Sequence, residues 1–211
     1  EQQTKGELVH TQWGDFTRYA DSSFIGGIAG SIGPKDEAVK GVHISNAYNG
    51  GIIGVDTTKD DYYDSGEYIG GIVGIISGYH KEGYNEDIYG ATDTVIEYAH
   101  NTGTITTGYG HVGGIVGYAT GLGKDYENNA SDMIIRHSYN DGKINAKYSG
   151  GIAGTFGGTI EQSYNNGALG EYSGGLVART ESDLYNDIVI RDSYNTKNGT
   201  AHVGGIIGVD Y

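Results

Sequence analysis

Two acidic segments of the chain contain residue types that could bind a metal ion. The first, "DTTKDDYYD", spans residues 56–64, and the second, "DYENNASD", spans residues 125–132. Both could wrap a hard cation such as calcium with oxygen ligands. Neither has the EF-hand spacing, so the alternative is a solvated acidic surface that binds no metal. The candidate calcium ligands are Asp56, Asp60, Asp61, Asp64, Asp125, Glu127 and Asp132.

Tyrosines accompany the acidic residues in the long segments between Gly-rich phrases. Residues 55–66, 77–94, 118–132 and 179–187 together contain 14 acidic and 4 basic residues, or −10 of the total net charge of −14. A tyrosine beside a carboxylate can stack on a sugar ring and hydrogen-bond its hydroxyls, or hold a cationic protein surface. The alternative is a set of solvated loops that keeps the protein soluble. The candidate binding residues are Tyr62, Tyr63, Tyr79, Tyr84, Tyr89, Tyr126 and Tyr185.

Motifs for common enzyme chemistry are missing from the sequence. "HKEGY" at residues 80–84 has the wrong order and spacing for a zinc protease, and neither a nucleophile elbow nor a phosphate loop is present. A solenoid polysaccharide lyase or hydrolase whose carboxylates work on a glycan stays open as an alternative, and its hydrolytic chemistry needs two carboxyl groups across a cleft. Basic residues are few and scattered, and we therefore predict a non-catalytic protein without a cofactor other than the candidate calcium.

Composition narrows the class of protein and the partners. The chain has 211 residues, with 39 Gly, 19 Tyr, one Pro and no Cys, and Ile and Val outnumber Leu. This is strand-forming composition without a disulfide framework. The net charge of −14 argues against nucleic acid and against an anionic membrane surface. The sequence also contains no signal peptide, membrane-spanning stretch or anchoring signal, so we expect any such segment to lie outside this fragment.

A repeated phrase organises most of the chain. Gly-Gly followed by Ile or Leu recurs at intervals of 24 to 44 residues, and a second phrase lies between these marks. The second phrase reads "ISNAYNGGII" at 44–53, "IEYAHNTGTI" at 96–105, "IRHSYNDGKI" at 135–144, "IEQSYNNGAL" at 160–169 and "IRDSYNTKNG" at 190–199. Self-similarity on this scale indicates a stacked repeat.

The shortest repeat indicates a β-solenoid. A unit of 24 residues is too Gly-rich for a helix pair and too short for a propeller blade, which needs about 40 residues. Three short strands separated by tight bends, "GGIAG", "GTIEQSY" and "GALGEY", fit the length and form one rung. We expect about six rungs, paired through parallel backbone hydrogen bonds, with the long segments as loop insertions. The predicted inward rows are Ile28, Ile72, Ile115, Ile152, Leu176 and Ile206; then Ile44, Ile96, Ile135, Ile160 and Ile190; then Ile53, Ile105, Ile144 and Leu169.

Other recurrent residues have predicted structural roles in this stack. We expect glycines with positive φ at the sharp corners and glycines where backbones approach closely. The recurrent Asn residues should form a buried amide ladder, and the Tyr or His before each one should form an aromatic ladder rather than a ligand platform. Residues 1–23, which contain Trp13, depart from the phrase and are predicted to be a partial rung or a cap, whereas residues 24–211 form the solenoid. Both ends of the stack should expose open strand edges.

The phrase "SYNNGALGEYSGGLVA" and its relatives ending in "GGIAG", "GGIVG" and "GGIIG" resemble the GLUG motif. The resemblance covers roughly residues 24–208. Most copies have Ile in place of Leu, "GGLVA" at 174–178 lacks the final Gly, and the insertions are unusually long. This motif is found in bacterial surface adhesins and in non-catalytic parts of some immunoglobulin A proteases. The resemblance implies a right-handed β-solenoid stalk or adhesive segment of a large secreted or cell-wall-bound bacterial protein.

These observations predict a structural and adhesive module at the bacterial cell surface. Its partners would be a host or microbial surface protein or a glycan, together with neighbouring domains of the same chain. Nucleic acid and membrane insertion are not expected. The alternative is a pure spacer without a ligand.

Overall fold

The structure is a computed structural model that describes residues 7–11, 14–18, 24–32, 38–54, 68–79, 89–108, 110–120, 133–180, 188–197, 199–201 and 203–210. These residues form β-strands and no helix, in agreement with the Ile-, Val- and Tyr-rich composition. None of these ranges therefore holds a helix long and apolar enough to span a membrane. The all-β prediction is confirmed for the described part of the chain.

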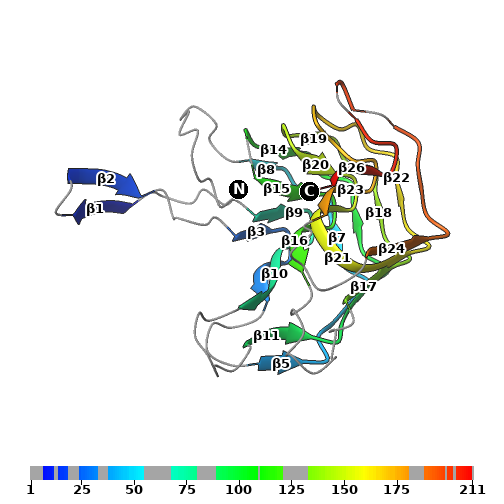
Figure 1. The fold of residues 1–211 in the computed structure, drawn as a ribbon, viewed down its shortest axis with the longest axis horizontal. Helices are drawn as coiled ribbons and strands as arrows, with labels where there is room; N and C mark the ends of the chain where they lie inside the picture. Colours follow the sequence, from blue (N-terminus) through cyan, green and yellow to red (C-terminus); the bar gives the residue numbers. More distant parts are fainter. Residues whose placement is uncertain are drawn as a thin grey trace.

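Short parallel strands stack in columns, and one circuit through the columns is called a coil below. Two columns lie on either side of the Gly-Gly turn. The strands before the turn are β3 (Phe24–Gly26), β9 (Tyr68–Gly70), β15 (His111–Gly113) and β20 (Ser149–Gly150). The strands after it are β4 (Ala29–Ile32), β10 (Val73–Tyr79), β16 (Val116–Thr120), β21 (Ala153–Glu161), β23 (Val177–Thr180) and β26 (Ile207–Asp210). Figure 1 shows successive coils following one another from blue to red.

Three further columns contain the second phrase of the repeat. The first consists of β6 (His43–Ser45), β12 (Thr94–Glu97), β17 (Met133–Arg136), the end of β21 and β24 (Ile188–Arg191). The second consists of β7 (Tyr48–Asn49), β13 (His100–Asn101), β18 (Tyr139–Asn140), β22 (Tyr164–Asn165) and β25 (Tyr194–Asn195). The third consists of β8 (Ile53–Gly54), β14 (Ile105–Thr106) and β19 (Ile144–Asn145). All these pairs are parallel, as in a solenoid-like stack.

Among the described strands, antiparallel pairing occurs at two places. β1 (Glu7–Thr11) and β2 (Gly14–Arg18) form a two-stranded sheet of their own. The end of β10 pairs antiparallel with β11 (Tyr89–Thr92), and β11 pairs in parallel with β5 (Ala38–Lys40). β5 and β11 lie at the lower edge of Figure 1. The prediction that residues 1–23 form a partial rung or a cap stays a prediction.

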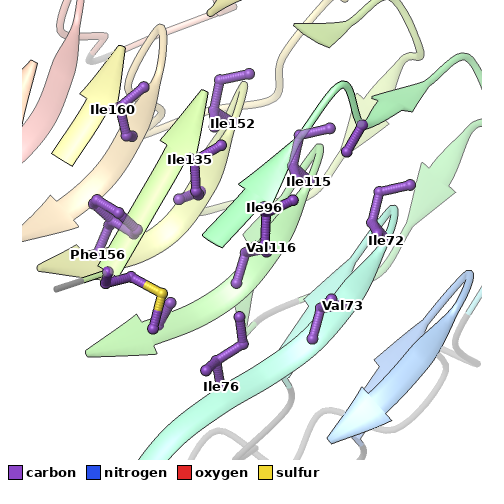
Figure 2. Close-up of a cluster of buried hydrophobic side chains, with 14 of the residues drawn as sticks. Ile72, Val73, Ile76, Ile96, Ile115, Val116, Ile135, Ile152, Phe156 and Ile160 are labelled. Atoms are coloured by element: carbon purple, nitrogen blue, oxygen red, sulfur yellow. The ribbon is translucent and has the colours of Figure 1, made fainter. Parts of the chain in front are cut away.

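The predicted Ile rows form the core (Figure 2). Ile72, Ile115 and Ile152 are fully buried, and their backbones are linked by hydrogen bonds from each N–H to the carbonyl at the same position of the next coil. The second row aligns in register through Ile96, Ile135 and Ile160, which are also fully buried. Stacking alike side chains on one another buries an apolar core without any large residue in the rows.

The third row belongs to a separate, smaller apolar cluster. Ile105, Ile144 and Leu169 pack there with Ile69 and Val112 from the strands before the Gly-Gly turn. The chain on either side of the Gly-Gly turn therefore contributes to both clusters, because Ile69 before the turn belongs to the smaller one and Ile72 after it to the larger one. The first predicted row is less buried at the first and last coils, where Ile28 is 57% exposed and Ile206 is 36% exposed.

The corner conformations differ from the prediction. The recurrent positive φ angles at the corner between the second-phrase columns belong to Asn46, Tyr98, His137, Gln162 and Asp192, with φ between 48° and 53°. Among the described glycines only Gly41, Gly110 and Gly158 have positive φ. Most of the repeated glycines serve the other predicted purpose, the close approach of backbones. A Cβ on Gly114 would lie 2.2 Å from the carbonyl oxygen of Gly151 in the next coil.

The shortest coil also departs from three strands. Because no insertion interrupts it, β21 runs through two columns as one strand of nine residues. "GALGEY" forms no strand, although Leu169 is buried and the N–H of Ile144 donates to the carbonyl of Ala168. The short Gly-rich segment keeps its place in the row through this backbone bond.

Candidate functional site

Of the predicted binding tyrosines, the structure describes Tyr79 and Tyr89. These residues are directly opposite each other in the antiparallel pair of β10 and β11. The remaining predicted site residues lie outside the described ranges: Tyr62, Tyr63, Tyr84, Tyr126, Tyr185, Asp56, Asp60, Asp61, Asp64, Asp125, Glu127 and Asp132. The paired ends of β10 and β11 therefore flank segment 80–88, which contains Tyr84, on both sides.

The insertions recur at one place in the order of strands along the chain. Segments 80–88, 121–132 and 181–187 each follow a strand of the column after the Gly-Gly turn. Segments 121–132 and 181–187 come directly before β17 and β24 of the first second-phrase column, whereas 80–88 comes before β11, which is followed by β12 of that column. The flanking strands keep their parallel register with neighbouring coils, as in β10 with β16 and β12 with β17. Insertions at one corner of successive coils are how solenoid proteins present binding surfaces.

The Tyr or His before each ladder Asn forms an aromatic column. The ring planes of His100, Tyr139, Tyr164 and Tyr194 are within 6° of parallel, and neighbouring ring centroids are 4.8–5.1 Å apart. Burial, then the charge of Asp141, raises the pKa of Tyr164, so its hydroxyl stays protonated. Both faces of Tyr139 and of Tyr164 are covered by neighbouring rings, and a sugar can stack only on a free face. The interpretation of this column as a structural ladder is confirmed for these four rings, whereas the ring of Tyr48 in the first coil is tilted by 52° to His100 and its hydroxyl lies 2.9 Å from Thr102 Oγ1.

A buried amide ladder runs beside the aromatic column. The Nδ2 of each Asn donates to the Oδ1 of the next, with distances of 2.7 Å from Asn49 to Asn101 and from Asn101 to Asn140. The next two links, from Asn140 to Asn165 and on to Asn195, are 2.8 Å long. Each inner amide also donates to the backbone carbonyl two residues later. These amides are satisfied within the stack and are not available to a ligand.

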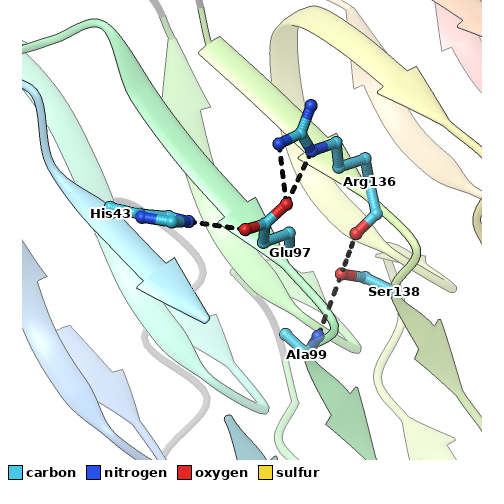
Figure 3. Close-up of polar contacts among 5 residues, drawn as sticks. All are labelled: His43, Glu97, Ala99, Arg136 and Ser138. Carbon is cyan, nitrogen blue, oxygen red and sulfur yellow. Dashed lines mark hydrogen bonds and ion pairs between the residues drawn. The ribbon is translucent and has the colours of Figure 1, made fainter. Parts of the chain in front are cut away.

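Charged side chains form ion pairs along the first second-phrase column, which contains β6, β12, β17, the end of β21 and β24 (Figure 3). Glu97 accepts hydrogen bonds from Arg136 Nε at 2.8 Å and stands 2.8 Å from His43 Nε2. The hydrogen bonds with His43 and Arg136 lower the pKa of Glu97. Glu161 and Arg191 repeat the arrangement two coils later, with 2.5 Å between Oε2 and Nη2. These two carboxylates are ion-paired and hydrogen-bonded, so neither is set up as a general base.

A second aromatic column, which the sequence analysis did not predict, is formed by the residue that stands two positions before each Gly-Gly pair. His111 stacks on Tyr68 with centroids 5.0 Å apart and meets the edge of Tyr118, while its Nδ1 lies 2.5 Å from Thr155 Oγ1. Burial, together with the charge of Arg179, lowers the pKa of His111 to about 4. This histidine is neutral at physiological pH and acts as a packed ring rather than as a proton carrier.

The same column continues through an Arg–Tyr contact. The guanidinium carbon of Arg179 is 4.3 Å from the ring centroid of Tyr148, and Tyr148 lies 5.4 Å from Tyr172. The sequence signal for this column is the recurrent aromatic residue in "FIGG", "YIGG", "HVGG", "YSGG" and "YSGG", starting at residues 24, 68, 111, 148 and 172. Within the described residues, no three His, Asp or Glu side chains stand close enough together to bind a metal ion.

Comparison of the chain with protein-family models, with the curated proteins and with the solved structures found no match.

Proposed function

We propose that residues 24–211 form a right-handed parallel β-solenoid of about six coils, built from GLUG-like repeats. Its function would be that of a non-catalytic structural and adhesive module of a large bacterial surface protein, located outside the cell. The acidic, Tyr-bearing insertions would bind a host or microbial surface protein or a glycan. This proposal rests on one observation above all: along the chain, three insertions lie between a strand of the column after the Gly-Gly turn and a strand of the first second-phrase column.

The contacts within the stack support a structural role for the coils and a binding role for the insertions. The Asn amides, the stacked rings and the Glu97–Arg136 pair all bind residues of neighbouring coils. These side chains hold the coils in register and are already engaged there. The insertions contain most of the surplus negative charge and many tyrosines, the residue types suited to sugar hydroxyls or a cationic protein patch.

The test is binding of the 211-residue chain to a glycan array and to a panel of host surface proteins. Tyr63→Ala and Tyr84→Ala, one in each of two insertions, should weaken binding at least about tenfold if either ring is an anchor. Tyr98→Ala is the matched control, because Tyr98 is half exposed on the stack and stands on His137 rather than in an insertion. The control should bind as the parent chain does.

Two outcomes would contradict the proposal. Absence of binding to every glycan and protein tested would leave a spacer that only separates neighbouring domains. Release of products from polysaccharides, abolished by substitution of insertion carboxylates, would instead make the chain a solenoid polysaccharide-degrading enzyme.

A further inference from the structure

Side chains from the strands after the Gly-Gly turn pack on the second aromatic column. The positions of Tyr118, Thr155 and Arg179 align in register in β16, β21 and β23. The ring of Tyr118 lies 5.1 Å, between centroids, from the rings of both Tyr68 and His111. This row therefore places one residue beside the aromatic column in each of three successive coils.

The row is neutral until it reaches Arg179. Thr155 is fully buried, and its Oγ1 has a partner in His111 Nδ1, 2.5 Å away. One coil later Arg179 stands at the same position, and its guanidinium carbon is 4.3 Å from the ring centroid of Tyr148. A ring face attracts a cation but accepts only weak hydrogen bonds, so it does not satisfy the N–H donors of a guanidinium.

Arg179 lacks a polar partner within the described part of the chain. Its Nε is buried without a hydrogen-bond partner there, and no described carboxylate forms an ion pair with it. Arg136 and Arg191, by contrast, pair with Glu97 and Glu161. Burying part of a guanidinium without an acceptor is unfavourable. An anionic ligand would supply the acceptor that the stacked coils do not.

Lys147 adds a second positive charge at the same ring. Its Nζ is 5.8 Å from the ring centroid of Tyr148 and 5.6 Å from that of Tyr172. Lys147, Tyr148, Tyr172 and Arg179 are all half-buried, so part of each side chain faces solvent, and we call these four residues the Arg179 cluster. Two cations and two tyrosine rings thus lie together on a chain whose net charge is −14.

The backbone around the Arg179 cluster is already paired on both sides. Gly174 pairs with Gly150 and with Gly204, and β23 lies between β21 and β26. A peptide that binds by adding a strand needs a free strand edge, which these strands do not offer. Recognition at the cluster must therefore use side chains, namely two cationic groups for negative charge and tyrosine rings for apolar C–H surface and hydroxyl groups.

We propose that the Arg179 cluster binds the carboxylate of an acidic sugar, such as a uronic acid within a glycan. Arg179 holds the carboxylate through paired N–H bonds, the ammonium group of Lys147 adds attraction, and the solvent-facing parts of Tyr148 and Tyr172 contact the sugar. The surplus negative charge of the chain repels a densely charged polyanion far more than a single carboxylate among neutral hydroxyls. The site belongs to the stacked coils and does not depend on what the insertions bind.

Isothermal titration calorimetry of the 211-residue chain with a tetramer of galacturonic acid tests the proposal. The parent chain should bind this tetramer and should bind the uncharged galactose tetramer at least about tenfold more weakly. Arg179→Gln should weaken binding of the acidic tetramer by at least about tenfold. Arg179→Lys should restore only part of the affinity, because an ammonium group retains the charge without the planar fork of donors. Arg191→Gln is the matched control and should bind as the parent does, since Arg191 pairs with Glu161 in another column.

Further variants separate this site from effects on folding and from the insertions. Arg179→Gln should fold, because it removes a part-buried charge that has no described partner, and its melting temperature without sugar checks this. Lys147→Gln tests the cluster without changing Arg179 and should weaken binding by up to about fivefold. Tyr63→Ala and Tyr84→Ala, which lie in insertions, should leave binding of the acidic tetramer unchanged. Failure of this site is therefore distinguishable from failure of the proposed function.

Four results would overturn the proposal. The first three are no binding of the acidic tetramer, equal binding of the two tetramers, and undiminished binding by Arg179→Gln. The fourth is tighter binding of a tetraglutamate peptide than of the acidic sugar, because the cluster would then recognise an acidic peptide instead.

Discussion

The amide ladder permits a quantitative prediction at its centre. Asn140 is fully buried, its Nδ2 donates to the carbonyl of Gly142 at 2.9 Å and to Asn165 Oδ1 at 2.8 Å, and its Oδ1 accepts from Asn101 at 2.7 Å. Asn140→Ala removes all three bonds and leaves three buried polar groups each short of a partner. At about 1 kcal/mol for each bond, and more where a group is stranded, the free energy of unfolding should fall by about 3–5 kcal/mol.

The assay is urea unfolding followed by circular dichroism, compared with Asn145→Ala. Asn145 is the matched control because its side chain makes only a long bond, 3.4 Å, to the exposed Thr106 hydroxyl. That variant should lose no more than about 0.5 kcal/mol. Asn140→Asp should be at least as damaging as Asn140→Ala at neutral pH, because a carboxylate has no proton to give to Asn165 or Gly142. Equal stabilities for Asn140→Ala and Asn145→Ala would refute the claim that the ladder holds the coils together.

Other variants test separate parts of the structure. Gly114→Ala should prevent folding or lower the free energy of unfolding by several kcal/mol, because its Cβ would overlap the next coil's backbone. Soluble yield and circular dichroism measure this, and a variant that folds as the parent does would contradict the prediction. The pKa of His111 is about 4 in the folded chain and 6.5 ordinarily, so as the pH falls the unfolded chain takes up the proton first. The free energy of unfolding should therefore decrease from about pH 6.5 to pH 4, and His111→Gln should flatten that slope in urea titrations at several pH values; an unchanged slope would contradict it. Gln162→Gly should leave stability unchanged or raise it by up to about 1 kcal/mol, since glycine relieves the left-handed φ of 48°, and a clear loss would show that the angle stores no strain. If the acidic insertions bind calcium, the ion should raise the melting temperature relative to chelator, and Asp64→Asn should reduce the shift; identical melting with and without calcium would contradict a site.

The sequence predicted the columns because each column repeats one residue type. Ile96, Ile135 and Ile160 recur at the same position of the phrase, and parallel stacking is the arrangement that buries all of them together. The Asn ladder followed from the same logic, since a buried amide needs a partner and its repeat supplies one. The corners were harder, because left-handed φ at Tyr98 or His137 has no signature in residue type. The coils impose that angle by their register.

The sequence predicted which segments contain the candidate binding residues, but not the strand pairing at the ends of these segments. The acidic surroundings of Tyr79 and Tyr89 indicated these residues, yet nothing in them indicates the strand pair that sets the two opposite each other, in which β11 also pairs with β5 of the preceding coil. Segments 33–37 and 80–88 differ in length and sequence, so repeat comparison gives no alignment there. The aromatic column containing His111 was overlooked because Phe, Tyr and His alternate at one position.

The uninterrupted strand β21 shows that a circuit can close without any excursion. Gly157 and Gly158 occupy the junction that other coils fill with longer segments, and the strand continues through them into the next column. Lengthening such a junction is inexpensive, since each doubling of a flexible loop adds only about 0.6 kcal/mol of closure entropy. The insertions can thus change in length and sequence while the stacked coils stay the same. A foreign peptide inserted between Gly157 and Gly158 would occupy the junction at which other coils carry their insertions.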